Sequence, residues 1–555
     1  MDLLLIEMKL EYKYSFLTLT HLWHPVLSSW ELPFETLQHH FAKLVAMDTA
    51  MKIIVSLAII YGLRILVLRM RRPNYLPGPK RLPIIGNLLD MPESEGWVTY
   101  KQWKEQYGDA IYLEIFGSPI VVLNTYKACI DLLEKRADIY SDRPIGIMAN
   151  KLMGWHQAVM MAPYNERWRR FRKICAQSMR KDVVKKFHPV QEREVARYLG
   201  TLLHDPLHYM ENFRFTAGRT LLWNIYGIQI NEANDPIITT AEKAMQVGVF
   251  AAQPGNFLVD FFPALRYVPK WFPGAGWKEF ARKGRILAYD MVNIPFDMTV
   301  KDMNAGIHEP SLTSLSLERK EDEDTVRWCS ASLLAAGADT SVASVHAFFL
   351  AMVLHPEIQK RCQEEIDSVT GGTRLPEIVD KDSLPYMNAM MWELMRWQPV
   401  SPLALPHRLM KDDIYNGCLI PAGTVILGNT WAVARDPNLF VEPDRFNPDR
   451  YLPYFDKSIP HDPKDLPLDP NAFAFGYGRR ICAGVHYAET MFFISMARIL
   501  STFDITKAKD KHGAEITPEI KFNSSIVRET LNFECAINPR SETAKSLVMA
   551  GISSL

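Results

Sequence analysis

The residues with the strongest chemical potential lie in a short loop around Cys482, which reads FGYGRRICAG over positions 475–484. A single cysteine is most often a small buried hydrophobic residue, but the neighbours of this one favour a thiolate that binds a ligand. The loop contains three glycines, at positions 476, 478 and 484. Glycine permits tight turns and the close approach of a flat group to the backbone. A helix is expected to begin just after Cys482, so that backbone N–H groups point at the sulfur and stabilise its anion. Arg480 could reach a carboxylate on the rim of a ligand bound there.

A second chemical pair, Asp339 and Thr340, lies inside a long apolar helix that the hydrophobic spacing predicts over residues 325–352. Thr340 is four residues beyond Ala336, so its hydroxyl can bond to the Ala336 carbonyl and loosen the helix locally. Such loosening leaves room for a water molecule beside a hydroxyl and a carboxylate, an arrangement that can move a proton. The alternative is a helical threonine that only satisfies its own backbone.

Two further patterns place charged and aromatic side chains on common helix faces. Glu393 and Arg396 are three residues apart, and Trp168 and Arg172 are four apart, so each pair shares one face of a helix. Residues 166–186 hold nine Lys and Arg against two acids, which makes this stretch strongly basic. Taken alone, a Glu–Arg pair is most often a surface ion pair, and a basic run is most often a solvated face.

The loop pattern Phe-x-x-Gly-x-Arg-x-Cys-x-Gly resembles the haem-binding signature of the cytochrome P450 superfamily. Four further motifs appear elsewhere in the chain in the family's order, and the resemblance covers residues 73–540. It implies a mainly α fold with small β-sheets, and a haem b group whose iron takes Cys482 as its axial ligand. The other residues that it implies for cofactor binding are Trp168, Arg172, Ala336, Gly337, His407, Phe475, Gly478, Arg480 and Gly484.

The resemblance also gives roles to the two polar pairs. Asp339 and Thr340 match the acid–alcohol pair that delivers protons to dioxygen in the family. Glu393, Arg396 and Arg445 match a buried charge triad that locks the loops on the haem side. The first pair is therefore expected to be catalytic and the triad structural.

These assignments imply a monooxygenase that uses O2 and two electrons to hydroxylate a small organic molecule. No flavin or nicotinamide module follows residue 540, so the electrons are expected from a separate NADPH-dependent reductase. Its predicted docking site is the basic face that carries Arg169, Arg170 and Lys173. Two alternatives stay open: a haem-thiolate isomerase or dehydratase that needs no O2, and a haem protein that senses a ligand without turnover. The intact acid–alcohol pair favours the monooxygenase.

The substrate pocket is expected to be apolar, which favours a lipophilic and uncharged molecule. By family position its lining comes from residues 144–163 (including Trp155, Met160 and Met161), 246–262, Leu333, Ala336, 400–405 and Ser525–Val527. Stretches such as Trp271–Gly274 and Asn429–Ala432 look like fungal enzymes of the O-methylsterigmatocystin oxidoreductase and tryptamine 4-monooxygenase type. A terpenoid of fungal secondary metabolism is the favoured substrate, with an indole or a polyketide left open.

The N-terminal part predicts a membrane anchor at residues 47–72. The apolar run from Met51 to Met70 reaches the roughly 20 residues that span a bilayer. No small-residue cleavage site follows, which disfavours a secretory signal. The basic residues after the run predict a single-pass protein of the endoplasmic reticulum membrane with its catalytic domain in the cytosol. Residues 1–46 form an extension of unknown role, and 73–82 a proline-rich hinge.

Residues 83–540 are expected to form one mostly helical domain, followed by a tail at 541–555. The predicted elements are a β-hairpin at 110–123 and helices at 166–181, 325–352, 357–369, 383–397 and 483–500. Lys+Arg and Asp+Glu both number 63, so the chain lacks the basic excess of a nucleic-acid-binding protein. The seven scattered cysteines contain no CxxC pair, which favours a reduced compartment over a disulfide framework or a zinc site.

Overall fold

The structure is a computed structural model that describes Lys52, Ser56, Ile59, Tyr61, residues 73–232 and residues 235–553. The predicted extension at 1–46 and all but four positions of the predicted anchor at 47–72 lie outside the described residues. The chain divides into two compact units. Of the described residues, one unit contains those up to Leu76 together with 269–277 and 412–421, and the other contains the remainder.

In the first unit, β4 (Asp413–Tyr415) and β5 (Cys418–Ile420) form an antiparallel hairpin. The two residues between the strands, Asn416 and Gly417, have positive φ angles of 50° and 74°. An Asn-Gly pair adopts this left-handed geometry at little cost, so the turn is encoded locally. Asn74 donates a hydrogen bond of 3.2 Å to the Gly417 carbonyl oxygen and so ties the start of the described chain to this hairpin.

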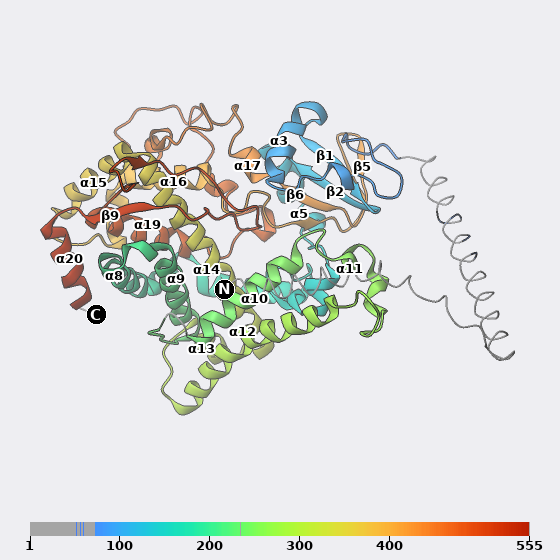
Figure 1. The fold of residues 1–555 in the computed structure, drawn as a ribbon, viewed down its shortest axis with the longest axis horizontal. Helices are drawn as coiled ribbons and strands as arrows, with labels where there is room; N and C mark the ends of the chain where they lie inside the picture. The colour runs from blue at the N-terminus through green and yellow to red at the C-terminus, as the bar shows by residue number, and fades with distance from the viewer. Residues whose placement is uncertain are drawn as a thin grey trace, which may run out of the picture. The chain divides into compact units, whose positions relative to one another are not determined.

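The second unit is mostly helical with small sheets, as predicted (Figure 1). The five helices predicted by spacing are α6 (Glu166–Met179), α14 (Glu323–Leu354), α15 (Pro356–Thr370), α16 (Pro385–Trp397) and α19 (Val485–Thr502). The other long helices are α3 (Gly96–Tyr107), α8 (His188–His204), α9 (Tyr209–Tyr226), α10 (Pro236–Ala252), α12 (Trp277–Ala305) and α20 (Glu542–Ser553). Short helices are α4 (Tyr126–Cys129), α5 (Ala137–Tyr140), α7 (Lys181–Val184), α11 (Leu258–Phe261), α13 (Leu312–Glu318), α17 (Thr430–Val433) and α18 (Leu452–Phe455).

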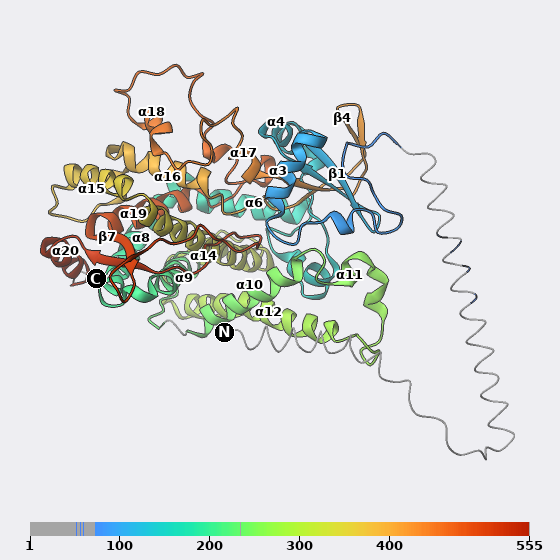
Figure 2. The same cartoon turned by 45° about the horizontal axis from the view of Figure 1, so that its top comes forward.

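The longest helix, α14, runs through the core of this unit beside α9, α6 and α19 (Figures 1 and 2). Asp322 caps its start, because the side chain accepts a hydrogen bond from the Thr325 backbone N–H at 2.9 Å. Among the described residues, α14 is the one helix that is long and apolar enough to cross a membrane, but 72% of its apolar stretch is buried inside the protein. Its hydrophobicity is therefore that of a core helix, which holds Asp339 and Thr340 at its middle.

A four-stranded sheet has the order β1-β2-β6-β3. β1 (Ala110–Ile115) and β2 (Ser118–Leu123) form the predicted hairpin, and β6 (Val425–Gly428) runs parallel to β2. β2 includes Pro119, which lies where β2 pairs only with β1, so its missing N–H is not needed. β3 (His407–Arg408) completes this sheet and brings His407 to the cavity described below. A three-stranded sheet is built from β7 (Phe503–Lys509), β8 (Glu515–Ile516) and β9 (Cys535–Pro539) in the order β8-β7-β9.

The C-terminal tail contains α20, which packs against α8 (Figure 2). A side chain at Gly200 of α8 would come within 2.3 Å of the Ile552 side chain, so the glycine makes the space in which Ile552 sits. The two helices therefore approach closely enough to bury Val548 of α20.

Glu393 and Arg396 on α16 form a buried ion pair and not a surface one, as predicted from the resemblance. Both side chains are 0% exposed, and Arg396 donates to both carboxylate oxygens of Glu393 at 2.7 and 2.8 Å. The remaining donors of Arg396 reach the backbone carbonyl oxygens of Ala434, Pro443 and Arg445 at 2.8, 2.6 and 3.1 Å. One guanidinium thus ties α16 to the two loops that precede the cysteine loop.

The third charged member is Arg450, and the assignment of Arg445 was wrong. The Arg445 side chain is 66% exposed and pairs with Glu442, whereas Arg450 is 7% exposed and lies 3.0 Å from the Glu393 carboxylate. The sequence contains Pro-Asp-Arg twice, at 443–445 and 448–450, and only the second copy turns its arginine inward. The residue types of the two copies are the same, so they do not show which arginine pairs with Glu393; the path of the backbone does.

Replacing Arg450 by alanine is expected to destabilise the protein by about 3–5 kcal/mol, because the buried Glu393 carboxylate loses a cation. The matched change Arg445→Ala removes an exposed charge and is expected to stay within about 0.5 kcal/mol of the parent protein. Urea unfolding of the two purified variants, together with their haem content, checks this. Equal loss of stability in both would contradict the corrected triad.

Candidate functional site

The cysteine loop and the middle of α14 face one another across a cavity of about 310 Å³. Most of the residues predicted for cofactor binding line it: Trp168, Arg172, Ala336, Gly337, His407, Phe475, Arg480, Cys482 and Gly484. They come from α6, α14, β3 and the loop before α19, segments that lie far apart in the sequence. The fold therefore gathers the sequence-predicted chemistry into one place.

Cys482 is held by the turn that precedes α19. Its backbone N–H donates to the Phe475 carbonyl oxygen at 2.8 Å, which closes the loop on itself. Burial raises the pKa of the Cys482 thiol, while the backbone N–H of Gly484 and the positive charge of Arg172 act to lower it. The N–H group and the guanidinium both stabilise an anionic sulfur, which is the form that ligates a metal.

Cationic groups gather at one end of the cavity. Arg143, Arg172 and Arg480 all line it, and the Arg480 guanidinium lies 4.6 Å from the centre of the Trp168 ring. Burial, together with the neighbouring Arg480, lowers the pKa of Arg143 to about 9, and burial lowers that of Arg480 to about 10. Crowding these charges in an apolar cavity is costly unless anions join them.

The hydrogen bonds of these groups fit a ligand that carries carboxylates. Arg480 donates to the carbonyl oxygens of Ser141 and Ala162, each at 2.8 Å, but its Nη1 is buried without a partner. A buried donor left unpaired costs about 1–3 kcal/mol, so an acceptor is expected there. The propionates of haem would supply that acceptor and the negative charge, and the apolar walls fit a porphyrin plane. The residues present therefore fit haem b, with Cys482 placed to bind its iron.

Arg143 belongs to this set, although the sequence did not point to it. Its guanidinium donates to the carbonyl oxygens of Met160, Leu405 and Pro406 at 2.9, 2.8 and 2.7 Å. These bonds fix its position between the segment before α6 and the segment before β3. The available signal was an arginine in Asp-Arg-Pro immediately before the predicted pocket segment at 144–163.

His407 lines the cavity, but its neutral ring offers no hydrogen-bond donor to a ligand there. Its Nδ1 lies 2.8 Å from the Tyr140 carbonyl oxygen, which can only accept, so Nδ1 carries the hydrogen. Burial and the charge of Arg143 lower the pKa of His407 to about 3. The neutral ring leaves Nε2 as an acceptor, so the arginines are the donors available to a carboxylate.

Two predicted glycines have roles other than contact with the cofactor. Gly478 does not line the cavity; it has a φ of 56°, and a Cβ there would lie 2.1 Å from the Leu133 carbonyl oxygen. It allows the loop to lie against the backbone of residues 130–134. Gly337 does line the cavity, but a Cβ there would come within 3.0 Å of Leu221, so its missing side chain accommodates that leucine.

The structure separates the two members of the acid–alcohol pair. Thr340 lines the cavity, and its hydroxyl donates to the Ala336 carbonyl oxygen at 2.8 Å, as the spacing predicted. Asp339 does not line the cavity and accepts a hydrogen bond of 3.0 Å from Arg214 on α9. Arg214 also donates to Glu529 at 2.6 Å, so the guanidinium is shared by two carboxylates. Burial raises the pKa of Asp339, Arg214 lowers it and Glu529 raises it, with a net rise.

The part of the cavity away from the cations is apolar, but the sequence predicted only some of its lining. Val159, Met160, Leu333 and residues 400, 401, 404 and 405 face it as expected, with Leu221 added from α9. None of residues 246–262 or 525–527 lines it, and neither Trp155 nor Met161 does. Trp155 instead packs against α10, where a Cβ at Gly248 would lie 2.8 Å from its ring.

The basic face on α6 is partly neutralised by acids. Lys173 pairs with Glu321 at 2.7 Å, and Arg169 lies 3.4 Å from Glu166. Both basic side chains are about 60% exposed (62% and 59%), and Arg170 is also exposed. The face therefore presents cations to solvent with lower net charge than the sequence run suggested.

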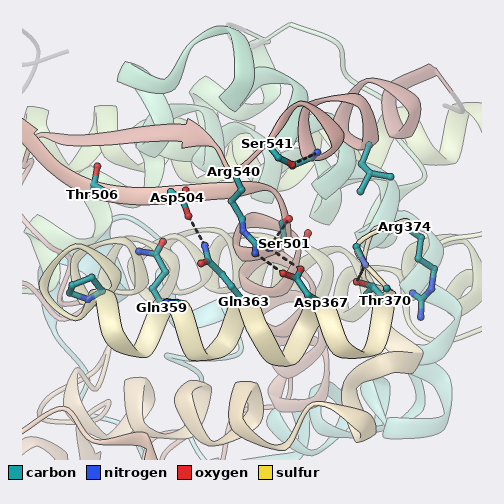
Figure 3. A pocket seen from close by; sticks show the side chains of 16 residues that line it. Gln359, Gln363, Asp367, Thr370, Arg374, Ser501, Asp504, Thr506, Arg540 and Ser541 are labelled. Carbon is teal, nitrogen blue, oxygen red and sulfur yellow. Dashed lines mark hydrogen bonds and ion pairs between the residues drawn. The ribbon is translucent and has the colours of Figure 1, made fainter.

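A second hollow of about 780 Å³ lies between α15, β7 and α20 (Figure 3). Its polar side chains pair with one another: Arg540 with Asp367 at 2.6 Å and Gln363 with Asp504 at 2.9 Å. These contacts hold α15 to the C-terminal sheet, so the hollow is explained by packing and not by a ligand.

The chain matches the family model described as Cytochrome P450 over residues 76–534. It is 40% identical over 481 residues to cytochrome P450 monooxygenase 208 of Postia placenta, covering 85% of this chain and 92% of that one. It is 37% identical over 485 residues to tryptamine 4-monooxygenase of Psilocybe cyanescens, covering 85% and 94%. A zebrafish cytochrome P450 solved with abiraterone has a TM-score of 0.62 at 20% identity, covering 80% of this chain and all of that one, which supports the fold alone.

Removing the guanidinium of Arg143 tests its place in the cationic end of the cavity. Arg143→Ala is expected to speed haem loss to apomyoglobin about tenfold or more, because a charge-assisted contact of about 1.5–3 kcal/mol is removed. Arg479→Ala is the matched control, since Arg479 contacts Tyr164 and does not line the cavity. Equal haem dissociation rates for Arg143→Ala and the parent would contradict the assignment.

Proposed function

The chain belongs to the cytochrome P450 family, and from this premise we propose that it hydroxylates a neutral lipophilic molecule of fungal secondary metabolism. It is an oxidoreductase of the monooxygenase class. The observation that carries the proposal is the pairing of Cys482 with Thr340 across one cavity whose remaining wall is apolar. We propose a terpenoid substrate, with an indole or polyketide as the competing classes.

Haem b, when bound to Cys482, supplies the activation of O2 by two electrons and the transfer of one oxygen atom to the substrate. The sulfur of Cys482 would ligate the iron, and the Gly484 N–H and Arg172 stabilise a negative charge on it. Arg143, Arg172 and Arg480 would hold the two carboxylates of the haem.

Thr340 is proposed to hold the last water of a proton path. Its hydroxyl hydrogen is committed to the Ala336 carbonyl oxygen, so the hydroxyl oxygen is an acceptor toward the cavity. A water that donates to this oxygen has a second hydrogen free for the reacting centre. Asp339 then supplies a new proton to that water from the side of α9. Arg214 pairs with the Asp339 carboxylate, and protonation of the carboxylate weakens this ion pair.

The cavity lining supports a neutral substrate. Among the described residues, no Asp, Glu or Lys lines it, and its arginines lie at the carboxylate-binding end. The hydroxyls of Ser332, Ser401 and Thr340 donate to backbone carbonyl oxygens, so these three groups can offer a ligand only acceptors. A cationic amine would lose its hydration without a counter-ion, whereas a terpenoid hydrocarbon would lose nothing.

We further propose that a membrane-bound, NADPH-dependent flavoprotein reductase delivers the electrons at the face carrying Arg169, Arg170 and Lys173. This face belongs to α6, the helix that also carries the cavity residues Trp168 and Arg172. The proposed location is the endoplasmic reticulum membrane, with residues 47–72 as the single span and the haem domain in the cytosol.

Thr340→Ala separates the monooxygenase from an isomerase, a dehydratase or a sensor. The variant is expected to keep haem and to accept electrons, but product per NADPH should fall several-fold while hydrogen peroxide rises in compensation. The reason is that the water at the end of the proton path loses the Thr340 oxygen as its acceptor. Dioxygen that has taken up two electrons then leaves as hydrogen peroxide. NADPH, peroxide and product are measured in one reaction.

The matched control is Thr370→Ala on α15, where the hydroxyl makes the same bond to the carbonyl four residues earlier, at 3.0 Å, away from the cavity. Its product per NADPH should equal that of the parent. Turnover without NADPH in the parent protein would contradict the proposed function, and unchanged coupling in Thr340→Ala would contradict the proton path.

Reversing the charges of Arg170 and Lys173 to glutamate is expected to raise the KM for the reductase several-fold and leave product per NADPH unchanged. Exposed charges steer association, so the effect should shrink as salt is added. Lys243→Glu on α10 is the control for a charge reversal elsewhere on the surface. A KM that does not change in the double variant would place the docking face on another surface.

A further inference from the structure

Two thiols meet where α6 crosses α14. The sulfur atoms of Cys175 on α6 and Cys329 on α14 are 3.7 Å apart, although the residues are 154 positions apart in the sequence. Both side chains are almost fully buried, at 1% and 0% exposure. All seven cysteines are free thiols, and this is the pair in contact in the part of the chain that the structure describes.

One member of this pair faces the haem cavity. Cys175 lines the cavity, on the same face of α6 as Trp168 and Arg172, which lie seven and three residues earlier. Cys329 does not line the cavity and lies behind Cys175. An oxidant that forms in the cavity can therefore reach the Cys175 sulfur, which has a second sulfur directly beside it.

We propose that Cys175 and Cys329 are a peroxide-reactive pair that closes to a disulfide between α6 and α14. The proposal rests on the proposed monooxygenase function for its oxidant, because uncoupled turnover releases hydrogen peroxide into this cavity. In the first step the Cys175 sulfur attacks one oxygen of hydrogen peroxide, the O–O bond breaks, and sulfenic acid and water are formed. In the second, the Cys329 sulfur attacks the Cys175 sulfur and the hydroxyl leaves as water. Two thiols and one peroxide thus give one disulfide and two waters.

The geometry needs only a small adjustment. A disulfide bond is about 2.05 Å long, so the two sulfurs must approach by roughly 1.7 Å, a shift that side-chain rotation and a slight approach of the helices can supply. Competing partners are poorly placed. Cys362 lies on α15, and Cys482 is committed to the haem iron when the cofactor is bound. The cross-link would join the helix of the basic face to the helix that carries Thr340, and reducing conditions would reverse it.

The test is made on the full-length, haem-loaded protein in detergent. Free thiols are alkylated under denaturing conditions after exposure to hydrogen peroxide, and a tryptic digest is analysed by mass spectrometry without reduction. The expected product joins peptide 174–180 to peptide 328–360, which contain Cys175 and Cys329. Alkylatable thiols should fall from seven to five, and dithiothreitol should restore them.

Variants and a second arm sharpen the result. In Cys329→Ser the link should disappear and Cys175 should become reactive to dimedone as a sulfenic acid. Cys362→Ser removes a buried cysteine outside the pair and should leave the yield of the link unchanged. The proposal is overturned if peroxide oxidises methionines or other cysteines while Cys175 and Cys329 both remain alkylatable, or if Cys175 links to Cys482 instead.

The second arm replaces added peroxide by reductase, NADPH and O2 without substrate. The same link is expected there. A link that forms with added peroxide but not in this arm would contradict uncoupled turnover as the source of the oxidant and leave the cysteine pair supported.

Discussion

The proposed haem site requires an anionic sulfur inside a cavity with largely apolar walls. Burial opposes the negative charge on Cys482, and only the Gly484 N–H and the Arg172 guanidinium act in its favour. To aim that N–H group, the chain must turn sharply just before α19, and the turn lies directly against the backbone near Leu133. Glycine is therefore required at position 478 for steric reasons, because a side chain there would collide with the Leu133 carbonyl oxygen.

The same constraint explains the distribution of charge around the cavity. Three arginines face its cationic end, and a buried donor on Arg480 has no partner within the protein. Such an arrangement is unfavourable until a ligand with carboxylates occupies it, so cofactor binding and folding stabilise each other. In the Glu393–Arg396–Arg450 triad, by contrast, both arginines lie within ion-pair distance of the Glu393 carboxylate, which suits a structural role in tying the loops to α16.

The sequence predicted the chemistry better than it predicted the geometry. The Thr340 bond to Ala336 follows from local spacing, whereas the burial of Glu393 and Arg396 was expected only from the family resemblance, and the structure has both. The errors arise where tertiary packing chooses between equivalent residues. Arg450 and not Arg445 pairs with Glu393, and Trp155 packs against Gly248 of α10 and not along the cavity. Arg143 was missed because its place in Asp-Arg-Pro before the pocket segment does not by itself show that the side chain reaches the cavity.

We propose that Cys482 provides the thiolate that binds haem iron. The most direct measurement is the spectrum of the dithionite-reduced, full-length holoenzyme with carbon monoxide, for the parent, Cys482→Ser and Cys129→Ser, a buried cysteine outside the cavity. If Cys482 is the ligand, the strongly red-shifted Soret band of sulfur ligation appears in the parent and in Cys129→Ser and is lost in Cys482→Ser. Survival of that band in Cys482→Ser, or its absence in the parent with a full haem complement, would contradict the account.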